Sequence, residues 1–447
     1  MKVLLIYPGS SDIYRKVGFI LPPLGLAYIA SVLRGNNYDV EIFDMKVSGK
    51  EPELSRYDVV GISADAMRYK EGLRIAKSAK GEGRTVIMGG PHPTFLDEDA
   101  LRNGADFVIR GEGEETALEL LEAIKGGLSP YGVKGISFHN NGGVHRTPAR
   151  KPVTDLDSLP LPSRDILPMH SYRTLEMGKR KVTSMITSRG CPYGCTFCAS
   201  SEFSGYSWRA RKPESVVNEI EHIVNNYGFN AIAFLDDNFT LNPRRVIEIC
   251  DEIIRRGIDI YWWCFSRADI LLRNEGMVKK MAEAGARYTF IGFESGRQEF
   301  LEGHKKRTKA SDAKETINLL RRYGIETHAS FIIGGIDETE EMARDTIRFA
   351  KELRPEAAQF SILTPYPGTK LFEDVKDRIT TYDWDLYDCL HSVVTLDHLK
   401  KEEVERLVRQ AYISFYVTPS RIFRGLLSGI RGKGIKLSSI LNILRGI

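Results

Sequence analysis

The chain has 447 residues, a length that allows two or three domains, each with a hydrophobic core of its own. A hydrophobic content of 42% and a charged content of 27% are ordinary for a globular enzyme, and the net charge of +4 does not indicate a nucleic-acid partner. No apolar run approaches the roughly 18 residues of a membrane-spanning helix, which argues against an integral helical membrane protein.

The first residues and the use of cysteine both indicate the cytoplasm. Residues 1–8 read as the start of a β-strand and are too short for a signal peptide. Three of the six cysteines are clustered, which is not the pattern of a disulfide framework. We therefore expect a protein of the reducing cytoplasm.

The first 147 residues alternate short β-branched segments with amphipathic helices. Strands are predicted at 3–7, 40–43, 59–63, 86–88 and 107–109, and helices at 24–33, 67–79 and 114–124. This alternation predicts an α/β fold whose first unit, at 1–147, is a doubly wound parallel sheet. A small hairpin, at 136–138 and 144–146, is predicted to close the unit.

Ligands of a doubly wound sheet bind outside the carboxyl ends of its strands. Three predicted strand ends of the first unit carry small residues, which would let a large flat ligand approach the backbone. The candidate residues are Gly61, Ser63, Gly89, Gly90, Gly111 and Glu112.

A proline-rich segment and a second alternating series follow. The segment at 148–175 has five prolines and is predicted to be an extended linker. The second unit, at 176–382, has predicted strands at 182–187, 231–235, 258–265, 288–293, 327–333 and 357–363, and helices at 214–227, 243–255, 276–284, 311–323 and 340–353. Six strand–helix units fit a partial barrel, whose active site lies at the carboxyl ends of the strands.

The C-terminal region, at 383–447, is predicted to be helical. Its tail at 421–447 carries six Lys or Arg and no Asp or Glu, interleaved with apolar residues. Two interpretations stay open. The tail can lie on an anionic membrane surface, or it can be a packing helix with a solvated basic face.

Three cysteines within eight residues carry the most specific chemistry of the chain. Cys191, Cys195 and Cys198 follow the predicted strand at 182–187, and Gly190 and Gly194 can adopt the backbone angles of a tight wrap. Ordinary iron–sulfur sites and structural zinc sites use four ligands. No Cys or His lies nearby in the sequence, so three ligands indicate a cluster with one iron left open. A zinc loop with a distant fourth ligand is the alternative.

This cysteine pattern resembles the radical S-adenosylmethionine (SAM) superfamily, down to the aromatic Phe197 before the last cysteine. The resemblance implies that Cys191, Cys195 and Cys198 hold a [4Fe-4S] cluster and that Phe197 belongs to the cofactor site. It also implies that the open iron chelates the amino and carboxylate groups of SAM, and that reductive cleavage gives a 5′-deoxyadenosyl radical.

The resemblance also indicates residues that could contact SAM at the other strand ends. Asp236 and Asp237 occupy the position of the family's Gly-Gly-Glu motif, from which this chain departs, and a turn with a helix N-cap is the alternative. Arg267 could pair with the carboxylate of SAM, and Glu294 with its ribose or amino group. For both, a structural ion pair is the alternative. Gly334 and Gly335 would allow close approach of the adenine.

A second resemblance covers the first unit. The segments at 22–26, 88–93 and 110–114 look like the cobalamin-binding domain that precedes many radical SAM modules. Many such domains ligate cobalt through the histidine of an Asp-x-His-x-x-Gly motif, and the corresponding loop at 12–18 has no histidine. The resemblance therefore implies cobalamin without a histidine lower ligand, with His92 lining the pocket or serving a structural role. A degenerate domain that binds nothing is the alternative.

Together the resemblances predict a radical SAM enzyme that methylates an unactivated carbon or phosphorus centre of a small-molecule or lipid substrate. A porphyrin-cyclase-like oxidative enzyme is the alternative. A methylthiotransferase needs cysteines in the first unit, and none precedes Cys191. A non-catalytic corrinoid or iron–sulfur carrier is the remaining hypothesis. An electron donor such as flavodoxin or ferredoxin is expected as a partner, and Cys250, Cys264 and Cys389 are expected to be packing residues.

Overall fold

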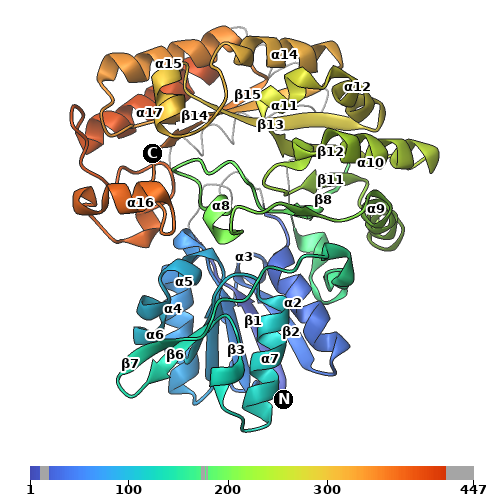
Figure 1. Ribbon diagram of the computed structural model, residues 1–447, viewed down its shortest axis with the longest axis vertical. Helices are drawn as coiled ribbons and strands as arrows, with labels where there is room; N and C mark the ends of the chain where they lie inside the picture. Colours follow the sequence, from blue (N-terminus) through green and yellow to red (C-terminus); the bar gives the residue numbers. More distant parts are fainter. Residues whose placement is uncertain (11–19, 173–176, 178–179, 419–447) are drawn as a thin grey trace.

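The computed structural model describes residues 1–10, 20–172, 177 and 180–418 (Figure 1). The basic tail at 421–447 and the loop at 12–18 therefore lie outside the described residues, and the structure does not test the predictions made for them. Within the described part, the chain forms two large β-sheets with helices packed on them.

The first sheet has the strand order β2-β1-β3-β4-β5-β6-β7. Its strands are β1 (Lys2–Tyr7), β2 (Asp39–Asp44), β3 (Val59–Ser63), β4 (Thr85–Gly89), β5 (Phe107–Ile109), β6 (Ile136–Asn140) and β7 (Gly143–Arg146). The first five run parallel, and β6 and β7 form the predicted antiparallel hairpin at the edge. The order reverses between β1 and β3, and doubly wound sheets bind ligands at such a switch point.

Helices cover both faces of the first sheet, which confirms the doubly wound fold. One layer has α2 (Leu24–Gly35) and α7 (Glu114–Lys125), and the other has α4 (Ala66–Gly81), α5 (Pro91–Phe95) and α6 (Asp97–Arg102), with the short α3 (Met45–Ser48) after β2. Along β1, Val3 and Leu5 pack into the first layer, while Leu4 and Ile6 pack into the second. Such alternation is what a strand buried on both faces requires.

The second sheet has the strand order β15-β14-β13-β12-β11-β8, and its pairings are parallel. Its strands are β8 (Val182–Met185), β11 (Ala231–Phe234), β12 (Tyr261–Ser266), β13 (Ala286–Glu294), β14 (Glu326–Ile333) and β15 (Ala357–Ile362). The main helices are α9 (Pro213–Tyr227), α10 (Pro243–Arg255), α12 (Glu275–Glu283), α14 (Asp312–Arg322) and α15 (Glu340–Leu353). All six strands and all five helices of the predicted partial barrel are present.

Several short elements were not predicted. They are β9 (Ser188–Arg189) and β10 (Arg209–Ala210), which pair with each other, and the helices α8 (Ala199–Phe203), α11 (Ala268–Arg273), α13 (Gln298–Gly303) and α16 (Lys370–Asp374). Beyond residue 383 the described chain is irregular until α17 (Lys401–Tyr416), which packs on β15. The prediction of a helical C-terminal region therefore holds for α17 alone among the described residues.

The proline-rich segment is packed against the rest of the protein. It contains short 3-10 turns, and Leu167, Met169 and Tyr172 are buried in the same core as the helices of the second sheet. The Arg164 guanidinium lies 2.7 Å from the carboxylate of Glu219 in α9, and both side chains are buried. The sequence predicted an extended linker here. In the structure, the buried apolar side chains of this segment hold it against the rest of the protein.

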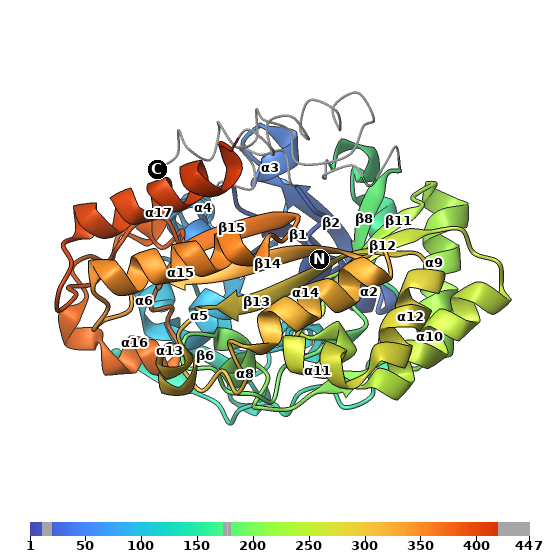
Figure 2. The same cartoon turned by 90° about the horizontal axis from the view of Figure 1, so that it is seen from above.

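The carboxyl edge of the first sheet faces the second sheet. In Figure 1, α8 lies between the two sheets, and α14 and α15 cover the side of the second sheet that is turned away from the first. Figure 2 looks down on that side, with α14 and α15 in front of the strands and β1 and β2 behind them. The face of the second sheet opposite to α14 and α15 is therefore turned toward the first sheet.

No helix in the described part of the chain is long and apolar enough to cross a membrane. This finding agrees with the sequence, and it does not address the basic tail.

Candidate active site

The three clustered cysteines lie on the loop between β9 and α8, at the carboxyl edge of the second sheet. All three side chains are partly buried, and their mutual electrostatic influence shows that they lie near one another. Gly190 and Gly194 have φ angles of 91° and 68°, which confirms that the loop needs left-handed backbone at these positions. A Cβ atom on Gly190 would overlap the carbonyl oxygen of Ser207, so the loop requires glycine there.

The ionisation of the thiols depends on their surroundings. Burial raises the pKa of Cys191 and Cys195, and for Cys195 the positive charges of Lys306 and Arg267 act in the opposite direction. Cationic neighbours stabilise thiolates, which are the form that binds metals. The loop therefore combines a partly dry setting with charges that favour metal ligation.

Asp236 supports the strand that leads into this loop. Its carboxylate is fully buried after β11, and it accepts hydrogen bonds from the Thr187 amide at 2.7 Å and from the Thr187 and Ser188 hydroxyls at 2.6 Å. The neighbouring Asp237 is exposed and accepts from the Gly190 amide at 3.0 Å. Both predicted SAM contacts are therefore engaged with the backbone or side chains of the segment that carries Cys191.

Arg267 also contacts the cysteine loop. Its guanidinium lies 3.6 Å from the ring centroid of Tyr193, the middle of the three residues between the first two cysteines, and donates to the Lys306 carbonyl at 2.9 Å. A third contact goes to the carboxylate of Asp269 at 3.0 Å. The predicted partner of the SAM carboxylate thus joins Tyr193 to the segment at 304–307.

Glu294 ends β13 in an unusual conformation. Its φ angle is 65°, in a region that residues other than glycine rarely adopt, and the ladder to β14 shifts register between Gly292 and Glu294. The carboxylate is buried and lies 2.6 Å from the ammonium of Lys306. This ion pair is the structural alternative that the sequence left open, and Glu294 places Lys306 close to Cys195.

Glu338 closes the glycine loop that follows β14. Gly334 has a φ angle of 86°, and the amides of Gly334 and Gly335 both donate to one carboxylate oxygen of Glu338. The Gly335 backbone also lies beside the ring of Phe300. The predicted adenine contacts therefore belong to a loop whose amides are held by a buried carboxyl group.

This carboxyl group should make stability depend on pH. Burial raises the pKa of Glu338 from 4.5 to about 7, against the opposing effect of the two amide bonds. The folded protein then holds the proton more tightly than the unfolded chain. The contribution of Glu338 to the free energy of unfolding is fully present below about pH 4.5 and is lost as the pH rises through 7. The loss is at most about 1.4 kcal/mol per pH unit.

We expect the melting temperature of the metal-free protein to fall more steeply between pH 5.5 and pH 7 than that of Glu338→Gln. The glutamine variant has no proton to lose, so its melting curve provides the matched reference. Equal slopes for the two proteins would show that Glu338 ionises normally in the fold.

His304 is a site residue that the sequence did not reveal. Its ring nitrogen Nδ1 lies 2.7 Å from the Thr196 hydroxyl, and its ring lies 5.7 Å from Phe197 and 4.5 Å from Phe300. The Thr196 amide donates to the His304 carbonyl, and the thiol of Cys195 lies 3.9 Å from the Lys305 carbonyl. The segment at 304–307 thus forms a second wall of the cysteine loop. Its cationic run of Lys305, Lys306 and Arg307 was the only visible signal.

The first sheet contacts the cysteine loop directly through Glu112. The carboxylate lies 2.8 Å from the guanidinium of Arg209 in β10 and 3.4 Å from that of Arg189, and Glu114 is 2.6 Å from Arg189. Burial favours the neutral form of Glu112, but Arg209 and Arg189 outweigh it and lower the pKa. Arg189 precedes Gly190 and Cys191, so the edge of the first sheet holds the start of the loop.

The predicted glycines of the first sheet serve different purposes. Gly61 lies within β3, and a Cβ there would be 2.8 Å from a methyl group of Leu5, so its space is filled. Gly90 has a φ angle of 96° and fits closely against Ala64 and Ser63 at the end of β3. Gly111, with a φ angle of 80°, has no heavy atom within 4 Å of an added Cβ.

The remaining predicted residue of this edge, Gly89, ends β4 and has the Ile109 carbonyl 3.5 Å from an added Cβ. Open space is therefore found at Gly111, while Gly61, Gly89 and Gly90 permit close packing of strands and loops.

His92 lies buried at the same edge between the rings of Tyr69 and Trp384, at 4.0 Å and 4.4 Å. Burial lowers its pKa to about 3, so the ring is neutral. Neither ring nitrogen has a hydrogen-bond partner among the described residues. The sequence left His92 either lining the pocket or serving a structural role, and its burial between two rings favours the structural role.

The donor set fits a cluster better than a single ion. A structural zinc ion is closed by four ligands, whereas the loop supplies three thiols. In a cubane, each thiolate binds a different iron, so three thiols spread along one loop suffice for three corners. At the facing edge, the open space beside Gly111 fits the approach of a large ligand such as cobalamin.

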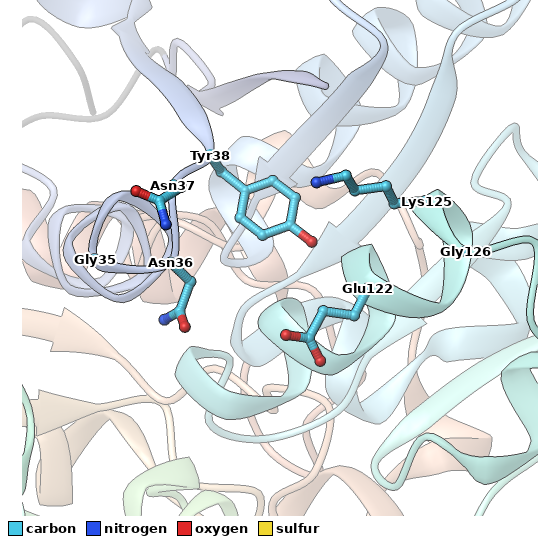
Figure 3. A pocket seen from close by; sticks show the side chains of 7 residues that line it. All are labelled: Gly35, Asn36, Asn37, Tyr38, Glu122, Lys125 and Gly126. Atoms are coloured by element: carbon cyan, nitrogen blue, oxygen red, sulfur yellow. The ribbon is translucent and has the colours of Figure 1, made fainter.

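A separate hollow lies at the opposite end of the first sheet. It is lined by residues at the C-terminal ends of α2 and α7, namely Gly35, Asn36, Asn37, Tyr38, Glu122, Lys125 and Gly126 (Figure 3). The ammonium of Lys125 lies 5.6 Å from the ring centroid of Tyr38. Because this hollow is at the amino end of the strands, it does not belong to the candidate active site.

Comparison with known proteins agrees with this geometry. Residues 185–350 match the model of the radical SAM superfamily, and residues 10–121 match the model of the B12 binding domain. An uncharacterised methyltransferase of Pyrococcus horikoshii is 38% identical over 440 residues, covering 95% of this chain and 95% of the relative. An anaerobic magnesium-protoporphyrin IX monomethyl ester cyclase of Rubrivivax gelatinosus is 30% identical over 434 residues, covering 93% of this chain and 78% of the relative.

A solved structure shares the whole fold. The cobalamin-dependent SAM radical enzyme OxsB, determined with aqua-cobalamin bound, superposes with a TM-score of 0.76 at 20% sequence identity, covering 99% of this chain and 72% of that one.

The chain therefore belongs to the radical SAM superfamily and carries a B12-binding domain ahead of the radical SAM module. It is an enzyme of the group that combines an iron–sulfur cluster, SAM and cobalamin. Both resemblances stated from the sequence are thus confirmed at the level of family and fold.

Proposed function

We propose that this chain is a cobalamin-dependent radical SAM methyltransferase that methylates an unactivated carbon, or a phosphorus centre, of a small-molecule or lipid substrate. The observation that carries the proposal is the contact of Glu112 and Glu114 with Arg189 and Arg209. These ion pairs bring the ligand-binding edge of the first sheet against the loop that carries the cysteines. Methyl transfer between two cofactors requires such proximity.

In this proposal Cys191, Cys195 and Cys198 hold the [4Fe-4S] cluster. A bound cluster would supply the electron for reductive cleavage of SAM. The chain's own part is to hold the loop rigid and partly dry. Asp236 fixes the strand before it, and Arg267 fixes Tyr193 within it.

Several predicted SAM contacts are better assigned to positioning. The carboxylates of Asp236 and Glu294 already accept from protein donors, at 2.6 Å to 2.7 Å. We assign them the task of placing the cysteine loop and Lys306. Gly334 and Gly335 stay the proposed contacts of the adenine, and Phe197 stays a proposed residue of the cofactor site. Asp237, which is exposed, stays a candidate for a polar group of SAM.

We propose that residues 1–147 form the cobalamin-binding domain and residues 176–382 the radical SAM domain, with 148–175 packed between them. Cobalamin would bind at the edge that carries Ser63, Gly90 and Gly111, without a histidine ligand from below. Glu112 would act in holding this edge to the cysteine loop, since Arg209 and Arg189 occupy its carboxylate.

An oxidative or ring-forming reaction is the second candidate, because the cyclase of Rubrivivax gelatinosus matches 93% of this chain. SAM labelled in its methyl group separates the two when given to the reduced, cobalamin-loaded protein. We expect cobalamin-dependent formation of S-adenosylhomocysteine. Production of 5′-deoxyadenosine without S-adenosylhomocysteine would instead support the cyclase-like reaction. Absence of both products would support the hypothesis of a non-catalytic corrinoid or iron–sulfur carrier.

An electron donor of the flavodoxin or ferredoxin type and contact of the basic tail with a membrane surface remain part of the proposal. Both follow from the sequence, and the described residues include no part of the tail.

A further inference from the structure

The turn at 364–369, which follows β15, is held firmly to its surroundings. The Tyr366 hydroxyl donates to the Tyr387 carbonyl at 2.8 Å. Thr369 is buried, and its hydroxyl donates to the Tyr366 carbonyl at 2.7 Å. The same hydroxyl accepts from the Phe372 amide at 3.1 Å, which caps α16. Groups that pack on this turn therefore keep a fixed position relative to the second sheet.

Gly368 of this turn is covered by a side chain of the first unit. Its φ angle is 82°, and an added Cβ would overlap three atoms of the Phe95 ring. Phe95 is the last residue of α5, the helix that follows β4. Because residue 368 has no side chain, the ring can lie directly against the backbone of the turn.

The turn and Phe95 are both connected to the cysteine loop. Leu371, three residues after Gly368, donates its amide to the Thr196 carbonyl of that loop at 2.8 Å. The Phe95 ring lies 6.4 Å from the ring of Phe203 in α8, the helix that follows the last cysteine. In Figure 1, α5 lies below α8 and α16. Phe95 therefore contacts two elements that are attached to the cysteine loop.

The helix α5 also forms part of the edge of the first sheet at which we propose that cobalamin binds. It starts directly after Gly90, and the Thr94 hydroxyl donates to the Gly90 carbonyl at 2.8 Å. The same hydroxyl accepts from the Gly111 amide at 3.0 Å. A displacement of α5 would therefore move the backbone at Gly90 and Gly111 with it.

Contacts with the second unit occur in both helix layers of the first sheet. Glu114 in α7, on one layer, pairs with Arg189 at 2.6 Å. Phe95 in α5, on the other layer, packs on Gly368. A contact in one layer alone would let the first sheet rock about it, whereas contacts in both layers fix the separation of the two facing edges.

We propose that Phe95 is a positioning residue for methyl transfer, which fixes the distance between the cobalamin edge of the first sheet and the cysteine loop by packing on Gly368. A misplacement of about 1 Å can lower the rate of a reaction between bound groups roughly a hundredfold. Phe95 acts through α5 and the turn at 364–369, and we assign it no contact with the substrate. The inference rests on the proposed function, because only cofactors that react with each other need a fixed separation.

Phe95→Ala tests this role through the magnetic interaction between the two cofactors. The reduced full-length protein, loaded with the cluster and cob(II)alamin, carries an unpaired electron on each, and their interaction in the paramagnetic-resonance spectrum depends on their separation. We expect this interaction to change in Phe95→Ala, with unchanged iron and cobalamin contents. The ratio of 5′-deoxyadenosine to S-adenosylhomocysteine should also rise about fivefold, since SAM cleavage continues while methyl transfer slows.

Phe107→Ala is the matched control. Phe107 is also a partly buried ring of the first sheet, but it lies on β5 and packs on Phe138 of the hairpin, with ring centroids 6.0 Å apart. Its replacement should lower the melting temperature and leave the spectrum and the product ratio unchanged. Equal changes in the two variants, or an unchanged spectrum in Phe95→Ala, would overturn the proposal.

Gly368→Ala tests the same contact from the opposite side, and it replaces Phe95→Ala if that variant does not fold. With Phe95 present, the added methyl group should displace the ring and change the spectrum as Phe95→Ala does. In a protein that already carries Phe95→Ala, the same substitution should have little further effect, because contacting residues are not independent. Additive effects would show that Gly368 acts without Phe95 and would contradict the proposal.

Amide hydrogen exchange of the metal-free protein separates this inference from the proposed function, because it needs neither cofactor. Phe95→Ala should speed exchange at 191–198 about tenfold, and Phe107→Ala should not. Failure of the unmodified protein to bind cobalamin would count against the proposed function. Unchanged exchange at 191–198 in Phe95→Ala would count against positioning by Phe95.

Discussion

Replacement of Cys191, Cys195 or Cys198 by alanine is expected to abolish SAM cleavage, with a loss of at least a thousandfold. Each thiolate would occupy one corner of the cluster. Loss of one ligand should therefore remove the cluster itself. Iron content, the visible absorption of the cluster and 5′-deoxyadenosine formation are measured on the same anaerobic samples.

Cys250→Ala is the matched control for these variants. Cys250 is buried in α10, away from the loop, and burial raises its pKa beyond the range in which a thiolate forms. Its replacement should leave a small cavity, cost about 1 kcal/mol and preserve both iron content and SAM cleavage. Retention of 5′-deoxyadenosine formation in any loop variant would contradict the assignment of the cluster.

Asp236→Ala is expected to destabilise the protein by about 3 kcal/mol, because it leaves the Thr187 amide and two hydroxyls buried without an acceptor. The melting temperature should fall by roughly 6 °C. Since these groups belong to the segment that leads to Cys191, the variant should also assemble less cluster per chain.

Asp237→Ala separates this structural role from a role in SAM binding. Asp237 is exposed and makes a single hydrogen bond to the Gly190 amide, so its loss should cost less than about 1 kcal/mol. A contact of Asp236 with SAM predicts the reverse pattern for Asp236→Ala, with an unchanged melting temperature and a raised dissociation constant for SAM. Thermal melting and SAM binding measured on both variants distinguish the two.

Local patterns were sufficient to predict the elements of regular structure. Strands such as β3 at Val59–Ser63 and helices such as α10 at Pro243–Arg255 carry strong periodicity, and their bounds agree with the sequence. The spacing of the three cysteines likewise lies within one loop, so its chemistry is visible without a structure. The turn glycines at 190 and 194 follow from the same local reasoning.

Contacts between distant parts of the chain could not be predicted in this way. Glu112 and Arg209 are separated by 97 positions, and Thr196 and His304 by 108. Asp236 was expected at a strand end, but only the fold shows that its carboxylate is occupied by Thr187 and Ser188. The sequence alone therefore does not distinguish a polar residue that contacts a ligand from one that holds the loop in place. The contacts in the structure are needed for that distinction.

Short elements were missed for a related reason. β9 and β10 have two residues each, and α11 and α13 have six, so none is long enough to show a hydrophobic period. Burial against the rest of the protein stabilises them, as Leu271 and Leu301 show. The sequence therefore predicted the strands, the long helices and the cysteine loop of the site. It did not predict that the segment at 304–307 packs against this loop.

The central assignment is tested most directly by paramagnetic resonance of the reduced, anaerobically reconstituted protein, recorded with and without SAM. Three sulfur ligands around a cubane predict one cluster signal per chain whose g values change when SAM occupies the vacant corner. A spectrum without a cubane signal, or one that is indifferent to SAM, would contradict it.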